Sequence, residues 1–144
     1  MRLVDSNKMI NYKEEVKDWK DAIRICCEPL LSENYIKPSY VDAIYDTAEK
    51  LGPYFDFGKG IAVPHARPET GVLKTGLSIL KLNKPVNLLD DEEHPIDVFI
   101  VLSAKDNTSH VELLRELSTF LMNNEDIKRL KASANVDDII NLLS

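Results

Sequence analysis

Cysteine is scarce in this sequence. Cys26 and Cys27 are the only two among 144 residues, and because they are adjacent they exclude a disulfide framework. Both fall on the apolar stripe of a predicted helix, so we expect them to be core residues in a cytoplasmic protein. No stretch approaches the roughly 20 apolar residues of a membrane span, and no apolar run follows a basic start as in a signal peptide. We therefore expect neither export nor direct membrane insertion.

Basic residues are outnumbered by acidic ones, 18 to 24, which gives a formal net charge of -6. Nucleic-acid binding needs a basic face, so this balance argues against a nucleic-acid partner and suits a small basic protein instead. The common ligand motifs are also missing: the sequence has no P-loop, no G-x-G-x-x-G, no G-x-S-x-G and no H-E-x-x-H. We predict no nucleotide, no cofactor and no metal.

An acidic run at residues 90–93 precedes His94 and is the one place where carboxylates and a histidine cluster in the sequence. Such groups can bind divalent ions, but four consecutive residues cannot all face one ion. We interpret the run as a solvated turn and His94 as a surface residue that the carboxylates keep charged.

The hydrophobic pattern predicts one α/β domain over residues 1–144, because a chain of this length can bury one core and is too short for two. The apolar run VFIVL at residues 98–102 is typical of a strand buried on both faces, which implies helices on both faces of the sheet. The predicted helices span residues 19–31, 38–51, 111–122, 125–132 and 136–143, and the predicted strands span residues 9–16, 60–63, 75–82 and 98–102.

The segment GIAVPHARPE, residues 60–69, carries the strongest functional signal. Pro64 cannot donate to a strand ladder, so the strand should end there and leave His65 as the first side chain beyond it. Arg67 and Glu69 follow, which places an anion-binding cation and a carboxylate beside the imidazole. This pattern favours a reactive histidine.

His110 is the second candidate. Ser109 and Glu112 form an S-x-x-E pattern, which predicts a capping box with His110 at the first position of the helix. A helix N-terminus disfavours imidazolium and offers backbone N–H groups to an anion. Since the buried strand at residues 98–102 leads into this helix, we expect His110 and His65 at the same edge of the sheet, where ligands bind in open α/β sheets.

Local explanations exist for each of these residues. A histidine after a proline is often a loop residue, and a histidine that opens a helix is often a capping residue. Arg67 could be an ordinary surface cation paired with Glu69. The expected convergence of both histidines on one edge nevertheless favours function over these alternatives.

The segment GIAVPHARPE resembles the active-site segment of the IIA components of the bacterial sugar phosphotransferase system (PTS), in the mannitol and fructose class, called EIIA type 2. The likeness extends over nearly the whole chain, and the run GPYFDFGKGIAVPHARPETGVLKTG most resembles the ascorbate-type branch. The resemblance implies a single type 2 domain with a mixed β-sheet flanked by helices on both faces.

The resemblance also implies a cytoplasmic phosphocarrier. The phosphohistidine protein HPr would donate a phosphoryl group to His65, and a cysteine of a IIB component would accept it, in the service of a membrane permease, IIC. The transported compound would be a sugar or sugar acid, with ascorbate as a candidate. By matching position, His65 is the phosphoacceptor and His110 the second active-site histidine, and we expect Arg67 and Ser109 to bind phosphate.

One departure from the family pattern concerns Thr47. Mannitol-type relatives carry an arginine near this position that helps hold the phosphoryl group, and we expect Arg67 to replace it. Three other functions stay open on sequence alone: a regulatory IIA-like module that signals by its phosphorylation state, a phosphate-ester hydrolase that uses both histidines, and a non-catalytic binding module with structural histidines.

Overall fold

The computed structural model describes residues 4–143, which are organised around a five-stranded mixed sheet with the order β1-β4-β5-β3-β2. The β1–β4 and β3–β5 pairs are parallel, whereas the β4–β5 and β2–β3 pairs are antiparallel. The strands are β1 (Ile10–Lys13), β2 (Asp56–Gly58), β3 (Ile61–Ala62), β4 (Gly76–Asn87) and β5 (Pro95–Ser103).

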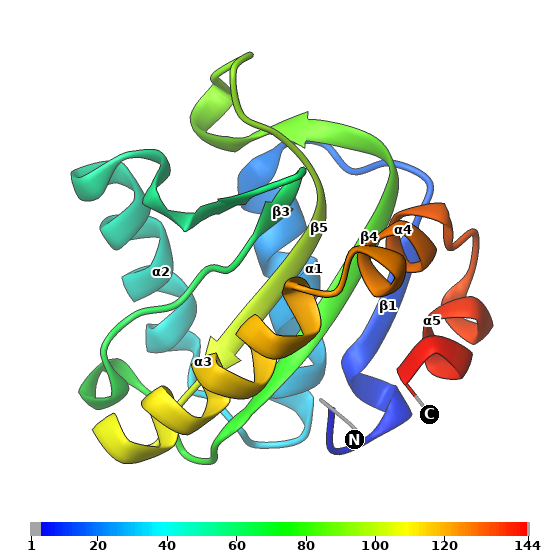
Figure 1. Ribbon diagram of the computed structural model, residues 1–144. Coiled ribbons are helices and arrows are strands. Elements are labelled where there is room, and N and C mark those ends of the chain that lie inside the picture. The colour runs from blue at the N-terminus through cyan, green and yellow to red at the C-terminus, as the bar shows by residue number, and fades with distance from the viewer. Residues whose placement is uncertain (1–3, 144) are drawn as a thin grey trace.

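Helices cover both faces of this sheet (Figure 1), with α1 on one face and α3 on the other. The helices are α1 (Trp19–Ser32), α2 (Pro38–Leu51), α3 (Asn107–Leu121), α4 (Asn124–Ala132) and α5 (Val136–Leu143), with short 3-10 turns at Asn7–Met9, Pro53–Phe55, Pro68–Thr70 and Leu88–Asp90. The predicted α/β class, with a mixed sheet between helical layers, is therefore confirmed.

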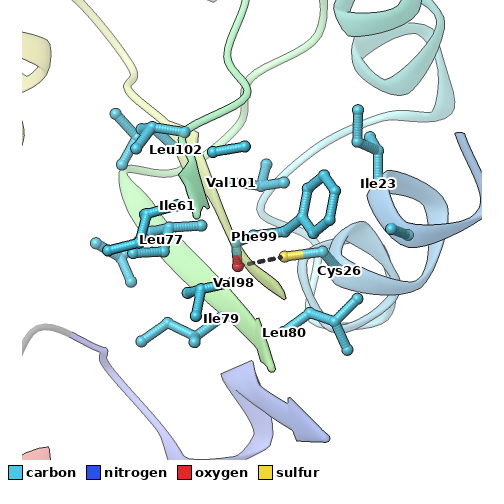
Figure 2. Close-up of a cluster of buried hydrophobic side chains, with 14 of the residues drawn as sticks. Ile23, Cys26, Ile61, Leu77, Ile79, Leu80, Val98, Phe99, Val101 and Leu102 are labelled. Atoms are coloured by element: carbon cyan, nitrogen blue, oxygen red, sulfur yellow. Dashed lines mark hydrogen bonds between the residues drawn. The ribbon is translucent and has the colours of Figure 1, made fainter. Parts of the chain in front are cut away.

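The core lies on both sides of β5, whose residues 98–102 have no exposed surface. Figure 2 shows Cys26 of α1 directed at the sheet, where its Sγ lies 3.4 Å from the carbonyl oxygen of Phe99. Burial raises the pKa of Cys26 to about 11, so the thiol stays protonated and unreactive. Both cysteines are buried and unpaired by disulfide, as predicted for core residues.

Three predictions about the elements are corrected. The sequence did not predict β2, and it predicted a strand at residues 75–82 where β4 continues to Asn87, across a break in register after Lys81. The capping box at Ser109 is wrong: Asp106 caps α3, and its carboxylate accepts the Ser109 N–H at 2.8 Å. Because Asp106, three residues before the predicted cap Ser109, takes this role, His110 is the fourth residue of the helix instead of the first.

The β2–β3 hairpin leads directly into the candidate site, and its turn depends on Gly60. This residue has a φ of 78°, and a Cβ there would lie 2.5 Å from Lys131 Nζ and 3.0 Å from Asp97 Oδ1. A side chain at this position would therefore strain the backbone and also displace the Lys131–Asp97 ion pair that joins α4 to β5.

His94 anchors the same hairpin from the loop before β5. Its Nδ1 lies 2.7 Å from the Asp56 carboxylate of β2, and its Nε2 lies 4.0 Å from Asp91. The hydrogen bond to Asp56, with a smaller electrostatic contribution from Asp56 and Asp91, raises the pKa of His94 above 6.5. The predicted charged histidine is thus paired mainly with a carboxylate outside the acidic run.

The His94–Asp56 pair should make the stability of the hairpin depend on pH. Because the folded-state pKa is raised, the stabilisation is fully present below the unfolded value of 6.5 and is lost as the pH rises through the folded value. We expect His94→Gln to reduce the free energy of unfolding more at about pH 5.5 than at about pH 9, measured by urea denaturation.

The difference in unfolding free energy between the unmodified protein and His94→Gln isolates this pair, because all other titrating groups are present in both proteins and their contributions cancel. In an Asp56→Asn background the same His94→Gln difference should be nearly independent of pH. If His94→Gln lowered the free energy of unfolding equally at both pH values with Asp56 intact, the role assigned to the pair would be contradicted.

Candidate active site

His65 and His110 meet at one edge of the sheet. Because β3 and β5 are parallel, their carboxyl ends lie at the same edge, and β5 continues from there into α3 (Figure 1). The Leu102 N–H donates to the Pro64 carbonyl at 3.2 Å, which keeps the segment after β3 beside β5 up to the last residue before His65. The imidazole centroids are 5.4 Å apart, with the rings tilted by 45°. The structure therefore brings the two predicted histidines together.

A hydrogen bond determines the tautomer of His65. Its Nδ1 lies 2.9 Å from the carbonyl oxygen of Val63. A carbonyl can only accept, so we assign the proton to Nδ1, and the neutral ring then carries its lone pair on Nε2. The Phe55 ring lies beside the imidazole with its centroid at 5.8 Å. Burial, with a smaller contribution from His110, lowers the pKa of His65 below 6.5 and favours the neutral ring at pH 7.

Tyr40 of α2 holds the segment around His65 in place, a role that the sequence analysis did not predict. Its buried hydroxyl donates to the carbonyl of Leu102 in β5 at 2.6 Å and accepts the N–H of Ala66 at 3.1 Å. One oxygen atom thus joins the central strand to the residue after His65. The position of Tyr40 next to the apolar stripe of α2 was the only available sequence signal, and it indicates burial without indicating this role.

A pocket of about 560 Å³ opens beside the two histidines. Its walls come from α2, from the segment after β3 and from the first turn of α3, and no carboxylate is among the residues that line it. The hydroxyl of Thr47 in the α2 wall donates to the Ala43 carbonyl of its own helix at 2.7 Å. The polar and charged lining residues are Thr47, Lys50, His65, Arg67, Thr70, Asn107 and His110.

A second pocket, of about 310 Å³, also borders His65. Its walls are mainly apolar and include Phe55 and Phe57 of the segment before the hairpin turn and Leu114 and Leu117 of α3. His65 therefore lines two pockets, of which the first contains cationic side chains and the second contains none.

The two predicted phosphate-binding residues differ in position. Arg67 lines the first, cation-containing pocket, although 86% of its side chain is exposed and its Nη1 lies 4.0 Å from Glu69, the distance of a weak surface pair. Ser109 is not among the residues that line this pocket, and its backbone N–H is bonded to Asp106. The structure thus brings His65, His110 and Arg67 to one pocket and leaves Ser109 outside it.

Within residues 4–143 no group of three or more histidine, cysteine or acidic side chains is arranged to hold a metal ion. None of the helices in this part of the chain is both long and apolar enough to cross a membrane.

Solved structures identify the class of protein. The fold is that of the mannitol-type enzyme IIA proteins of phosphotransferase systems. The solution structure of the mannitol-specific cryptic phosphotransferase enzyme IIA from Escherichia coli matches with a TM-score of 0.92 and 36% identity, over 100% of this chain and 99% of that chain. The complex of mannitol enzyme IIA with phosphorylated mannitol enzyme IIB from Escherichia coli contains a chain that matches with a TM-score of 0.81 and 30% identity, over 96% of this chain and 95% of that chain.

Sequence comparison identifies the family. Residues 4–144 match the family described as phosphoenolpyruvate-dependent sugar phosphotransferase system, EIIA 2, and the chain belongs to it. The ascorbate-specific PTS system EIIA component of Escherichia coli (strain K12) is 35% identical over 147 residues, which cover 99% of this chain and 96% of the relative. The predicted resemblance is confirmed, and the activity class is that of a phosphotransferase-system phosphoryl carrier.

The lowered pKa of His65 makes a direct prediction. We expect its ring resonances to titrate below pH 6.5 when followed by NMR, because burial disfavours the imidazolium. His110→Gln removes the smaller contribution, so the pKa of His65 should rise in this variant and still stay below 6.5. Titration of His65 at or above 6.5 in the unmodified protein would contradict the assignment of burial as the main cause.

Proposed function

We propose that this protein is a cytoplasmic phosphocarrier that accepts a phosphoryl group from phosphorylated HPr on Nε2 of His65 and passes it to a cysteine of a IIB component. The observation that carries the proposal is the hydrogen bond between Nδ1 of His65 and the Val63 carbonyl, in a ring that lies beside a pocket without carboxylates. This arrangement leaves a neutral ring whose Nε2 lone pair is the nucleophile.

The transfer needs little from the protein beyond position and charge. The Nε2 lone pair forms a bond to phosphorus, the phosphorus–nitrogen bond in the donor breaks, and its electron pair returns to the donor imidazole. The Val63 carbonyl stabilises the positive charge that the ring acquires, because it holds the proton on Nδ1. The same positive charge makes His65 a good leaving group when the phosphoryl group moves on to the next acceptor.

His110 and Arg67 are the proposed partners of the phosphoryl oxygens. The ring of His110 lies next to that of His65, with the centroids 5.4 Å apart. His110 is in the first turn of α3, whose N-terminus favours an anion. Arg67 lies two residues beyond His65 and lines the same pocket. Each can donate hydrogen bonds to the equatorial oxygens, on which negative charge is concentrated during transfer.

The partners and the substrate are inferred from the relatives. A mannitol enzyme IIA of the same fold forms a complex with phosphorylated enzyme IIB, which supports a IIB component as the acceptor here. The net charge of -6 suits a basic donor protein such as the proposed HPr. The ascorbate-specific relatives support uptake of ascorbate or a similar sugar acid through a IIC permease.

The other candidate functions have weaker support. A purely regulatory module would also need His65, but the relatives at 33–36% identity are named as ascorbate-specific or mannitol-specific enzyme IIA proteins. A hydrolase would need a positioned water, and a carboxylate to activate it is missing from the pocket lining. A structural role does not explain why two imidazoles lie beside a pocket that contains two cations.

The first test of the function is His65→Ala. The variant should take up no phosphoryl group from phosphorylated HPr, because the nucleophile is gone, while its circular dichroism spectrum stays that of the unmodified protein. Intact-mass measurement after incubation detects the added phosphoryl group. As a control, His94→Gln should be labelled normally, since His94 lies on a different loop. Undiminished labelling of His65→Ala would show that His65 is not the phosphoacceptor and would contradict the proposal.

The second test is His110→Ala. We expect phosphorylation at His65 to continue but to slow by about ten- to a thousandfold, the loss typical of one oriented hydrogen-bond donor. Rapid-quench measurement of a single turnover separates this rate from partner binding. An unchanged rate would reduce His110 to a structural residue of α3.

A further inference from the structure

Lys50 of α2 lines the cation-containing pocket beside His65, and the sequence patterns around His65 and His110 give no indication of it. It lies in the last turn of the helix, and its side chain forms part of the same wall as Thr47. We propose that Lys50 is a second cation that binds the phosphoryl group on His65, from a different element than Arg67. This inference rests on the proposed function, because the bound anion is the group that His65 carries.

The first argument is that Lys50 makes no ion pair within residues 4–143. Asp46 lies four residues earlier on α2, the spacing at which helical carboxylates commonly pair with lysine. No salt bridge joins the two residues. The adjacent Glu49 pairs instead with Lys20 of α1 at 2.7 Å. The positive charge of Lys50 is therefore not neutralised by a carboxylate of its own helix.

The second argument concerns the two helix ends at the pocket. The first turn of α3 contributes Asn107 and His110, and a helix N-terminus carries partial positive charge. The last turn of α2 contributes Lys50 and Leu51, and a helix C-terminus carries partial negative charge that would repel a phosphoryl group. A lysine at this end offsets the repulsion and makes both sides of the pocket favourable to an anion.

The third argument compares the two cations. Arg67 has 86% of its side chain exposed and lies 4.0 Å from the Glu69 carboxylate, so solvent and a neighbouring charge weaken its field. Lys50 is also exposed, but within residues 4–143 it forms no ion pair with a carboxylate. Its single ammonium on a flexible stem can follow the phosphoryl group during transfer, whereas Arg67 offers a planar fork from the segment after His65. The two residues therefore contribute in different ways to one site.

The test compares Lys50→Gln with Lys128→Gln. Lys128 is an exposed lysine of α4 outside the pocket lining, so the control changes the net charge equally. In single turnovers with phosphorylated HPr, we expect Lys50→Gln to lower the maximal transfer rate by about tenfold or more, with little change in the HPr concentration at half-maximal rate. Lys50→Arg should recover part of the rate, and Lys128→Gln should transfer at the unmodified rate.

A small donor separates this inference from the proposed function. Phosphoramidate transfers its phosphoryl group to histidine without a protein partner: the bond from phosphorus to the ring nitrogen forms, and ammonia leaves. We expect Lys50→Gln to slow this reaction as well. If the unmodified protein reacts with phosphoramidate but not with phosphorylated HPr, the proposed carrier function is wrong, and the phosphoramidate rates still measure the contribution of Lys50.

The proposal would be overturned by either of two results. One is a Lys50→Gln variant that equals the unmodified protein with both donors. The other is an equal slowing of Lys50→Gln and Lys128→Gln, which would assign the effect to net charge instead of to the pocket.

Discussion

The short parallel pairing between β3 and β5 determines where both histidines lie. Only Ile61 with Val98 and Ala62 with Phe99 form this ladder, yet it fixes the direction in which each strand leaves the sheet. With an antiparallel pairing, the segment after β3 would leave from the edge opposite to α3, and His65 and His110 would lie far apart. Residues 98–102 of β5, which have no exposed surface, supply the rigid reference to which this small strand is attached.

Positive charge is concentrated in one pocket of an otherwise acidic protein. The chain as a whole is acidic, whereas the pocket beside His65 is lined by two imidazoles, a lysine and an arginine without a carboxylate. A phosphoryl group would be repelled by the average surface and attracted only at this place. The neutral state of His65 fits the same arrangement, because burial removes a proton from the nucleophile while nearby cations supply the positive charge that the anion needs.

The sequence predicted the features that are expressed in contiguous patterns. The run at residues 98–102 indicated a covered central strand, and the proline before His65 indicated a strand end, because both signals depend on neighbouring residues. The α3 cap was wrong because Asp106 and Ser109 are both favourable N-caps, and the backbone path out of β5 decides between them. Strand β2 was missed since its three residues, Asp56–Gly58, show no alternation of buried and exposed side chains.

Residues of the candidate site that act across long sequence separations could not be predicted. Tyr40 lies 62 residues from Leu102 and 26 residues from Ala66, and only the packing of α2 against the sheet brings its hydroxyl to both. In the sequence, Lys50 is only one of the polar residues expected on the exposed face of an amphipathic helix. Its pocket forms only when the segment after β3 and the first turn of α3 pack near α2.

The bridging hydroxyl of Tyr40 also limits how far the active segment can be treated as a portable module. The ten residues 60–69 look self-contained in the sequence, yet the amide after His65 is held by an oxygen that belongs to another helix. Grafting these residues onto a different scaffold would transfer the imidazole without the atom that fixes the path of the chain beyond it. A transplant that preserves the site would have to include α2, and the smallest transferable unit is therefore defined by space instead of by contiguous sequence.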